Sequence, residues 1–416
     1  MRLLILSQYF EPELGAPQVR LAAFARELLR LGHQVEVVTA LPSHPLGRIF
    51  PAYRGRLYRR ETAPDGLVVH RVWCYAALGS GLKRMANYLS FAVTALAGLA
   101  RCRRPDLLFV ESPPLCLSLP GWIAARWWRA PMVFNVADLW PDSVAALGVL
   151  RAGPALGLAC RLETWSYARS RLVNAVTDGI RETLIRDKGL DPARVTFLPN
   201  GVDPVLFAPG PADPALAAEL GLEGRTVILY AGTLGLAQGL DVALDAMKLV
   251  APRRPEALLV FLGDGSDRRR LEDRVHAERI PGVRFLEARP LPEVARLYRL
   301  AFAGLAALRR LPLFERARPS KLFPIMASAR PVLYSGAGEG ARLVSGAGAG
   351  LAVPPEDPEA LARAMLRLLQ DPEAARTMGG NGRACVEAHF AWPRLVQSWL
   401  DQVAQSGCLS TPRPQP

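Results

Sequence analysis

Short apolar runs alternate with longer amphipathic segments along most of the chain. In the first half, five runs are long enough for a strand and hold few polar positions: LLILSQ, VEVVTA, LVVHRV, DLLFVES and MVFNVAD. Strands that are apolar on both faces are typical of parallel sheets covered by helices on both sides. The segment after the first run has helical periodicity, with Pro17 near its start and Gly32 at its end. The pattern predicts repeated βα units.

The same alternation restarts after an interval rich in proline, glycine and alanine, PNGVDPVLFAPGPADPA. It continues through TVILYAG, ALLVFLGDG, VRFLEA, AGLAAL and PVLYSG. A chain of 416 residues is too long for one ordinary core. We therefore expect an α/β protein with two Rossmann-like, doubly wound domains that face each other across a cleft.

The positions of these patterns give expected domain boundaries. We expect an N-terminal domain over residues 1–190, a linker over 191–220 and a C-terminal domain over 221–390. A last amphipathic helix over 391–405, after the Trp392-Pro393 break, is expected to pack back on the N-terminal domain.

An apolar stretch with basic ends lies within the first domain. Tyr88 to Ala100 form a run of 13 apolar or small residues, which is too short to span a bilayer. Lys83 and Arg84 precede it, and nearby GWIAARWWRA combines tryptophan with arginine. Such composition suits a helix that buries one face in the protein and can also contact lipid headgroups.

Composition supports a globular protein, with 50% hydrophobic and 21% charged residues. The net charge of +13 is concentrated, since Arg20 to Arg104 hold 14 Arg or Lys against 4 Asp or Glu. A basic surface suits anionic lipid, phosphorylated substrates or nucleic acid. The alternative is an arginine-rich solvated surface, because only four of the 51 basic residues are lysine. No nucleic-acid-binding motif is present, and we expect no nucleic acid partner.

Six cysteines are scattered without a CxxC pair, a spacing that argues against a disulfide framework or a zinc site. The N-terminal MRLLILSQYF is too short in its apolar part for a signal peptide and predicts a buried strand. We expect a cytoplasmic protein, peripheral at the inner face of the plasma membrane.

Two loops of the first domain carry candidate chemistry. Gly15 and Ala16 stand where the first strand leads into a helix, so that backbone N–H groups at the helix start can meet a phosphate. This is not a GxGxxG motif, and many such turns are only tight turns. Asp138 follows the strand MVFNVAD, at the edge where parallel sheets bind ligands. It can face a substrate hydroxyl or cap the helix that begins near Pro141.

Two small-residue loops follow successive strands of the second domain. YAGTLGLAQGLD contains Gly232, Thr233 and Gln238, and FLGDGSDRRRL contains Gly263 and Gly265. Both loops are small enough to admit a nucleotide against main-chain N–H groups. Two on neighbouring strands indicate a binding site more strongly than one.

The segment RPSKLFPIMASARPV supplies a cation beside these loops. Lys321 stands directly after Ser320 near a predicted helix start and can place its ammonium beside a diphosphate. The alternative is a surface lysine whose stem lies along apolar neighbours.

Together these stretches resemble the family-4-type retaining glycosyltransferases of the GT-B fold, over nearly the whole chain. The similarity is to bacterial enzymes of surface-polysaccharide synthesis, including those that transfer N-acetyl-L-fucosamine to lipid-linked sugars. It is carried by YFEPELGAPQVR, GHQVEVVTALPSHPLG, DLWPDS, YAGTLGLAQGLD, VFLGDG, RPSKLF and MASARPV.

The resemblance implies that the C-terminal domain holds a nucleoside diphosphate sugar, expected to be UDP-linked, and that the acceptor is a lipid-linked saccharide. It places Gly15 by the donor phosphates, Asp138 by the sugar or acceptor, and Lys321 by the diphosphate. It implies no metal or other cofactor, and no DxD motif occurs.

The chain departs from the family at Pro324, where a glutamate usually holds the nucleotide ribose, and at Ala329, where glycine is usual. Losing a hydrogen bond to a charged acceptor costs about 1.5–3 kcal/mol. Glu315 and Glu339 are the candidates to replace that contact. If Ser320 is the N-cap, Pro324 is the fourth helical residue and removes one backbone bond.

Three functions therefore remain open. The first is a hexosyltransferase-type enzyme of cell-surface polysaccharide or lipopolysaccharide synthesis. The second is a non-catalytic nucleotide-sugar-binding subunit of a glycan-assembly complex, which Pro324 would explain. The third, a nucleotide-sugar epimerase, needs further acid–base groups, and only five histidines occur.

Overall fold

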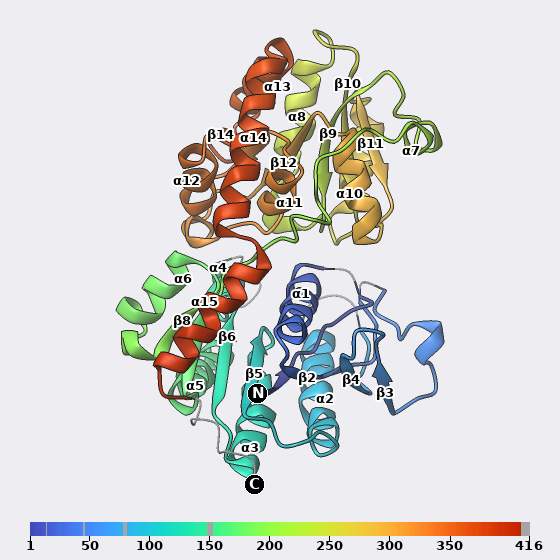
Figure 1. Cartoon of the computed structure of the whole chain (residues 1–416). Coiled ribbons are helices and arrows are strands. Elements are labelled where there is room, and N and C mark those ends of the chain that lie inside the picture. The colour runs from blue at the N-terminus through green and yellow to red at the C-terminus, as the bar shows by residue number, and fades with distance from the viewer. Residues whose placement is uncertain (14, 45, 78–80, 147, 149–152, 409–416) are drawn as a thin grey trace. The chain divides into compact units, whose positions relative to one another are not determined.

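The computed structural model describes residues 1–416 except 14, 45, 78–80, 147, 149–152 and 409–416 (Figure 1). The chain divides into two compact units. Unit 1 consists of Met1–Asn200 and Trp392–Pro416, and unit 2 of Gly201–Ala391. Each unit has a mainly parallel sheet with helices on its faces, which confirms the predicted pair of Rossmann-like domains. Within the described part of the chain, no helix is both long and apolar enough to cross a membrane.

Unit 1 is built on an eight-stranded sheet in the order β3-β4-β2-β1-β5-β6-β7-β8, in which only the β3–β4 pair is antiparallel. Its strands are β1 (Arg2–Leu6), β2 (Gln34–Ala40), β3 (Tyr58–Thr62), β4 (Val68–Val72), β5 (Leu107–Ser112), β6 (Met132–Val136), β7 (Leu172–Ala175) and β8 (Val195–Phe197). Its α-helices are α1 (Ala16–Arg30), α2 (Leu82–Leu99), α3 (Ser118–Trp128), α4 (Asp142–Ala146), α5 (Pro154–Arg169), α6 (Asp178–Glu182) and α15 (Trp392–Gln405).

The C-terminal helix α15 completes the core of unit 1. Its Trp399 is fully buried and packs edge-on against Phe24 of α1 and Phe109 of β5, with ring centroids 5.1 and 5.8 Å away. Such aromatic pairs add about 0.5–1.5 kcal/mol each to the free energy of burial. The Gln402 side chain also accepts from the backbone N–H of Phe197 at 2.8 Å. The last helix therefore belongs to the first unit.

Unit 2 is built on a six-stranded parallel sheet in the order β11-β10-β9-β12-β13-β14. Its strands are β9 (Thr226–Ala231), β10 (Ala257–Leu262), β11 (Val283–Leu286), β12 (Ala303–Ala307), β13 (Val332–Ser335) and β14 (Gly350–Val353). Its α-helices are α7 (Pro214–Glu219), α8 (Asp241–Val250), α9 (Arg268–Glu278), α10 (Leu291–Leu300), α11 (Leu322–Ala327), α12 (Gly338–Gly346), α13 (Pro358–Gln370) and α14 (Pro372–His389).

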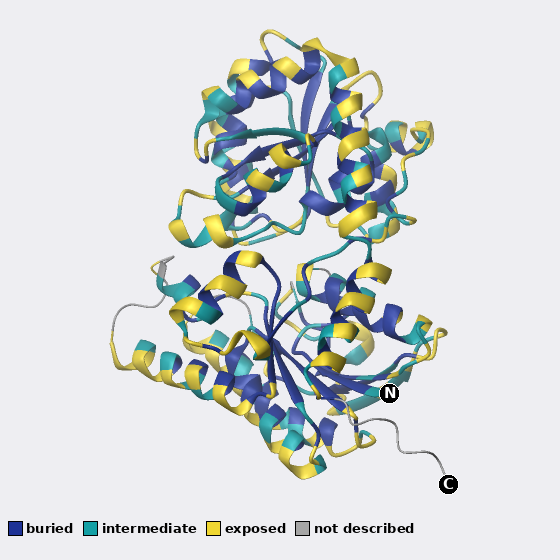
Figure 2. Cartoon of the chain, turned by 60° about the vertical axis from the view of Figure 1, so that its left-hand side comes forward, coloured by how far each residue is buried: buried dark blue, intermediate teal, exposed yellow. Residues whose placement is uncertain are grey.

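Burial follows the predicted pattern in both units. The strands at the centre of each sheet are dark blue in Figure 2, and most helices show one buried and one exposed face. The strand β10 is buried at all six positions, as expected for a strand with helices on both sides.

The expected linker over 191–220 is not a separate segment. Residues up to Asn200 belong to unit 1, where Val195–Phe197 form the edge strand β8. Residues from Gly201 belong to unit 2, where Phe207 and Leu216 are buried in its core. The proline-rich composition suggested a linker, but the apolar side chains in this segment have cores to pack against.

Candidate functional site

The candidate donor-site residues of unit 2 gather at the carboxyl edge of its sheet. Strand β9 lies between β10 and β12, so the loops after these three strands meet at one edge. The chain runs outward from β9 through β10 to β11 and returns to β12 on the other side of β9. Parallel sheets bind ligands where the strand order reverses in this way.

Lys321 is the cation of this edge. Its ammonium Nζ lies 5.1 Å from the centre of the Tyr230 ring. A Cβ atom on Gly232 would lie 2.7 Å from the Lys321 Cε and 3.3 Å from Nζ, so the side chain runs along this glycine. Burial lowers the pKa of Lys321 to about 8. Among the described residues no carboxylate pairs with it, and an incoming anion would stabilise its charged form.

The two glycine loops pack on each other. A Cβ on Gly263, which has a φ of 140°, would lie 2.1 Å from the carbonyl oxygen of Gly232. A Cβ on Gly265 would lie equally close to the carbonyl oxygen of Leu234. The sequence analysis explained these glycines by the space that a nucleotide needs against the main chain. In the structure, Gly263 and Gly265 are needed for the loops to pass each other.

Four further predicted residues lie on loops of the same unit. Gln238 turns its side-chain oxygen back to accept from the N–H of Gly235 at 3.1 Å. Thr233 is exposed, and its carbonyl accepts from the Tyr230 hydroxyl at 2.6 Å. Ser320 directly precedes Lys321 in a half-buried turn, and Glu315 is exposed on a 3-10 turn.

Ser320 is not the N-cap of the helix, and this changes the cost of Pro324. Helix α11 begins at Leu322 with Lys321 as its N-cap, so that Pro324 is the third helical residue. The N–H groups of the first turn have no partner within a helix. A proline at this position therefore removes no intrahelical hydrogen bond, and the helix tolerates it fully.

Of the two candidate replacements for the missing glutamate, Glu339 is engaged in an ion pair. The Glu339 carboxylate is buried and forms an ion pair with Arg318 at 2.8 Å. Glu315 packs its backbone against Gly338, where a Cβ would lie 1.9 Å from the Glu315 carbonyl oxygen. Glu315 keeps an exposed side chain at the loop and is the remaining candidate.

Ala329 has a left-handed backbone conformation, with a φ of 53°. This conformation costs a residue with a Cβ about 1–2 kcal/mol, whereas glycine adopts it freely. We expect Ala329→Gly to stabilise unit 2 by about 1 kcal/mol and to raise its melting temperature by about 2–4 °C. Calorimetry measures this shift. Ala317→Gly is the control. Ala317 has an ordinary φ of −100°, so its replacement by glycine should lower stability. A loss of stability in Ala329→Gly would contradict the prediction.

In unit 1, Gly15 and Asp138 lie at the carboxyl edge of the sheet, after β1 and β6. Gly15 is the N-cap of α1, and exposed Ala16 is its first residue. No side chain caps this helix end. Asp138 accepts from the hydroxyl of Ser143, a residue of α4, at 2.7 Å. Asp138 as a whole residue is exposed to solvent. The protein around its carboxyl group nevertheless desolvates that group and raises its pKa.

The sequence analysis missed Glu13, which lies in the same loop as Gly15. Its carboxylate is buried and accepts from the N–H groups of Ser43 and His44 at 2.7 and 2.8 Å. Burial raises its pKa to about 7 despite these hydrogen bonds. A carboxyl group that titrates near neutral pH at a strand end is a candidate proton donor or acceptor. The only signal in the sequence was a second glutamate in YFEPELG.

The comparisons with known proteins agree with this arrangement. Residues 15–201 match the family described as Glycosyl transferase 4-like domain, and residues 225–371 match Glycosyl transferases group 1. The chain is 27% identical to the D-inositol 3-phosphate glycosyltransferase of Kineococcus radiotolerans, over 95% of this chain and 92% of that protein. It is also 27% identical to the putative colanic acid biosynthesis glycosyl transferase WcaI of Escherichia coli, over 79% and 81%.

The fold has close matches among solved structures. The crystal structure of HepE from Anabaena in complex with UDP and glucose superposes with a TM-score of 0.74 at 18% identity, over 97% of this chain and all of that chain. The two family matches fall one in each unit and together span most of the chain. The chain therefore belongs to the glycosyltransferases of the GT-B fold, as a transferase with a 4-like first domain and a group 1 second domain.

Proposed function

We propose that the protein transfers a sugar from a nucleoside diphosphate sugar to a glycan acceptor, with retention of the anomeric configuration. The observation that carries this proposal is Lys321, whose ammonium lies at the carboxyl edge of unit 2 with its pKa lowered by burial. A half-buried cation without a carboxylate partner in the described structure suits an anionic ligand. The structure of HepE with UDP and glucose, which has a similar fold, supports a nucleoside diphosphate as that ligand.

The leaving group defines what Lys321 does. When the bond between sugar and diphosphate breaks, negative charge builds up on the departing phosphate oxygen. A fixed ammonium in a water-poor site stabilises that charge more in the transition state than in the ground state. In this proposal no metal ion is needed for the step.

Unit 1 contributes the acceptor side. Asp138 is proposed to orient a hydroxyl of the sugar or acceptor, and the uncapped start of α1 at Gly15 and Ala16 to approach the donor phosphates. Glu13 adds a group that can exchange a proton near neutral pH.

The test is a thermal-shift titration of the full chain against UDP-, GDP- and dTDP-sugars, followed by a transfer assay with the donor that binds. We expect one nucleotide class to stabilise the protein. The donor is expected to be UDP-linked. Failure of every donor in a folded sample would reject the donor site. Binding without transfer to any lipid-linked acceptor would favour the non-catalytic subunit.

We further propose that the acceptor is lipid-linked and that unit 1 contacts an anionic membrane surface. Four residues of α2 are exposed at helical spacing: Leu82, Met85, Leu89 and Val93. Three residues of α3, which packs against α2, are exposed in the same way: Leu119, Ile123 and Trp127. Neither helix contains an acidic residue, and exposed Lys83 and Arg126 carry positive charge. Such a surface suits an interfacial location. It supports a peripheral enzyme at the cytoplasmic face of the plasma membrane.

Replacing one exposed apolar residue of each helix should weaken membrane binding. Val93 and Trp127 are 70% and 64% exposed, so Val93→Glu combined with Trp127→Glu should leave the fold intact. We expect the double change to lower the affinity for phosphatidylglycerol vesicles at least about tenfold, because apolar contact is lost and charge repulsion is added. Co-sedimentation measures this affinity.

The control is Val205→Glu, which places one carboxylate at an 80% exposed position of unit 2. It should reduce vesicle binding far less than the double change. Equal binding of the wild-type chain to neutral phosphatidylcholine vesicles, or equal loss in the control, would reject the proposed membrane surface.

A further inference from the structure

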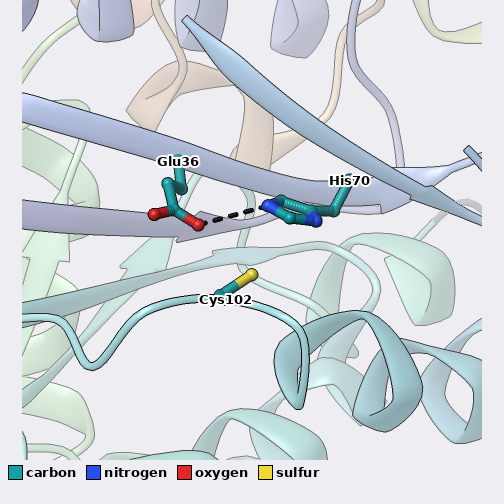
Figure 3. A group of neighbouring side chains, drawn as sticks. All are labelled: Glu36, His70 and Cys102. Atoms are coloured by element: carbon teal, nitrogen blue, oxygen red, sulfur yellow. Dashed lines mark hydrogen bonds and ion pairs between the residues drawn. The ribbon is translucent and has the colours of Figure 1, made fainter. Parts of the chain in front are cut away.

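Three metal-binding side chain types meet in unit 1, away from the edge that holds the candidate site. Glu36 comes from β2, His70 from β4 and Cys102 from the segment after α2 (Figure 3). One potential ligand atom of each lies within 4.8 Å of the other two. Figure 3 shows the Glu36 carboxylate and the His70 ring pointing toward each other, with the Cys102 sulfur turned toward both.

The sheet places the first two on one face. Glu36 and Val38 point to the same side of β2, and His70 and Val72 to the same side of β4. Gly98 of α2 lies so close to Val38 and Val72 that a Cβ there would be 2.9 and 3.0 Å from them. The group is therefore covered by α2, and His70 is 2% exposed.

The histidine is already oriented by a second partner. Its Nδ1 lies 2.9 Å from the Tyr58 hydroxyl, and its Nε2 lies 3.2 Å from the Glu36 Oε2. A hydrogen bond from Nδ1–H to the tyrosine oxygen would leave the Nε2 lone pair facing Glu36 and Cys102. Metal-binding histidines are held in this way by a hydrogen bond at the other ring nitrogen.

We propose that Glu36, His70 and Cys102 bind a zinc ion through one carboxylate oxygen, Nε2 and the thiolate sulfur. Zinc accepts oxygen, nitrogen and sulfur ligands together at about 2.0–2.3 Å, which places tetrahedral ligand atoms about 3.3–3.8 Å apart. The three potential ligand atoms now lie up to 4.8 Å from one another, so these distances must shorten by about 1 Å. Rotation of the side chains can provide this change. Water fills the fourth position.

Binding exchanges a proton for the metal. The Cys102 thiol now donates to the Gly98 carbonyl, with sulfur and oxygen 3.4 Å apart, and burial raises its pKa. On binding, the S–H bond breaks, its electron pair goes to the zinc and the proton goes to solvent. The histidine binds the metal through the Nε2 lone pair, with its proton on Nδ1 directed at the Tyr58 hydroxyl oxygen. Affinity should therefore increase about tenfold per pH unit until the thiol is ionised.

Basic groups around the cluster set a limit on its affinity. Arg60 lies opposite His70 on β3, and Arg101 and Arg103 flank Cys102 in the chain. Their charge repels a dication, whereas the Glu36 carboxylate and the Cys102 thiolate together balance it. The site lies on the sheet face below α2 rather than in the carboxyl-edge loops, so the metal would crosslink β2, β4 and the end of α2 and have no part in transfer.

The experiment uses the full chain without an affinity tag, stripped of metal and titrated with zinc against a colorimetric chelator. We expect one equivalent to bind. Cobalt in its place should give the near-ultraviolet charge-transfer absorption of a thiolate ligand. His70→Ala and Cys102→Ser should each weaken binding at least about a hundredfold, and Tyr58→Phe about tenfold.

Cys160→Ser is the matched control, because Cys160 is a half-buried thiol on α5 of the same unit. It should leave zinc affinity and the cobalt spectrum unchanged. The melting temperature of each metal-free variant shows that it is folded. A cobalt complex without thiolate absorption, or zinc binding that survives both Cys102→Ser and His70→Ala, would overturn the proposal.

Discussion

Lys321→Ala is expected to lower the rate of sugar transfer about 10²- to 10³-fold, the usual effect of removing one group that stabilises transition-state charge. Alanine removes the ammonium that lies beside Tyr230 and Gly232, so the departing diphosphate of the proposed reaction loses the charge of Lys321. The stabilisation of the protein by its nucleotide should fall with it. Steady-state kinetics and thermal shifts measure the two effects.

Lys248→Ala provides the control in the same unit. Lys248 lies on α8 and pairs at the surface with Glu278 and Asp245, so its loss removes the same charge from the chain without touching the carboxyl edge. We expect transfer to stay within about twofold, since such surface pairs contribute little. A Lys321→Ala enzyme that transfers at the wild-type rate would remove the basis of the proposed function.

The pH dependence of nucleotide binding separates a direct role of Lys321 from a structural one. Its pKa of about 8 in the free protein should rise when a diphosphate binds. Affinity should therefore be constant below about pH 7 and fall as pH rises above 8, by up to about tenfold per unit. The folded pKa lies below the unfolded value of about 10.4, so stability of the ligand-free protein should rise between about pH 8 and 10. Lys321→Ala should remove both dependences.

Glu111→Ala is expected to destabilise unit 1 by about 3–5 kcal/mol, because it leaves a buried charge without its partner. Glu111 of β5 is 1% exposed and forms an ion pair with Arg20 of α1, which is also buried. The Asn135 amide donates to the other carboxylate oxygen at 2.8 Å. Burial raises the pKa of Glu111, and the arginine and the asparagine counteract that shift.

The pair is one end of a row of polar side chains across the sheet. Asn174 donates to Asn135 at 2.7 Å, and Thr196 donates to Asn174 at 3.0 Å. Glu111, Asn135, Asn174 and Thr196 are direct register partners on β5, β6, β7 and β8. Removing the carboxylate therefore also leaves a buried amide donor unpaired.

Hydrogen exchange in increasing urea measures the effect for each unit separately. Amides of unit 1 should exchange faster in Glu111→Ala, while those of unit 2 keep their protection. Glu182→Ala is the control, since Glu182 pairs with Arg186 on an exposed surface of the same unit and should cost about 0.5 kcal/mol or less. A Glu111→Ala chain as stable as this control would show that the buried pair contributes nothing.

The apolar pattern predicted the long strands because burial on both faces leaves a direct trace in the sequence. The runs at β1, β9 and β10 are almost entirely apolar, the run at β2 holds few polar positions, and the structure has strands at all four. The sequence analysis did not name β3, β7, β8 or β14. The strand β3 is charged along YRRET and pairs at the sheet edge, while β7 and β8 are short and carry Asn174 and Thr196 at buried positions. Those polar residues are tolerated only because the sheet register supplies their partners.

For the candidate site, too, the sequence analysis found the local features and missed contacts between distant segments. The sequence placed Lys321 near a helix start and two glycine loops at strand ends, since these are local features. It missed the buried Glu13, whose backbone donors come from another loop. Cysteine spacing argued against zinc, yet the proposed ligands Glu36, His70 and Cys102 are more than 30 residues apart in the chain and meet only in the folded unit.

The sequence by itself determined which segments are buried, the two-domain α/β fold and the loops at the strand ends, because each depends on the order of residues within one segment. The tertiary structure decided which side chains meet. The contact of Lys321 with Tyr230 and Gly232, the polar row through Asn135 and the left-handed Ala329 depend on strand order and register. These are set by the packing of the whole unit, and no local periodicity encodes them.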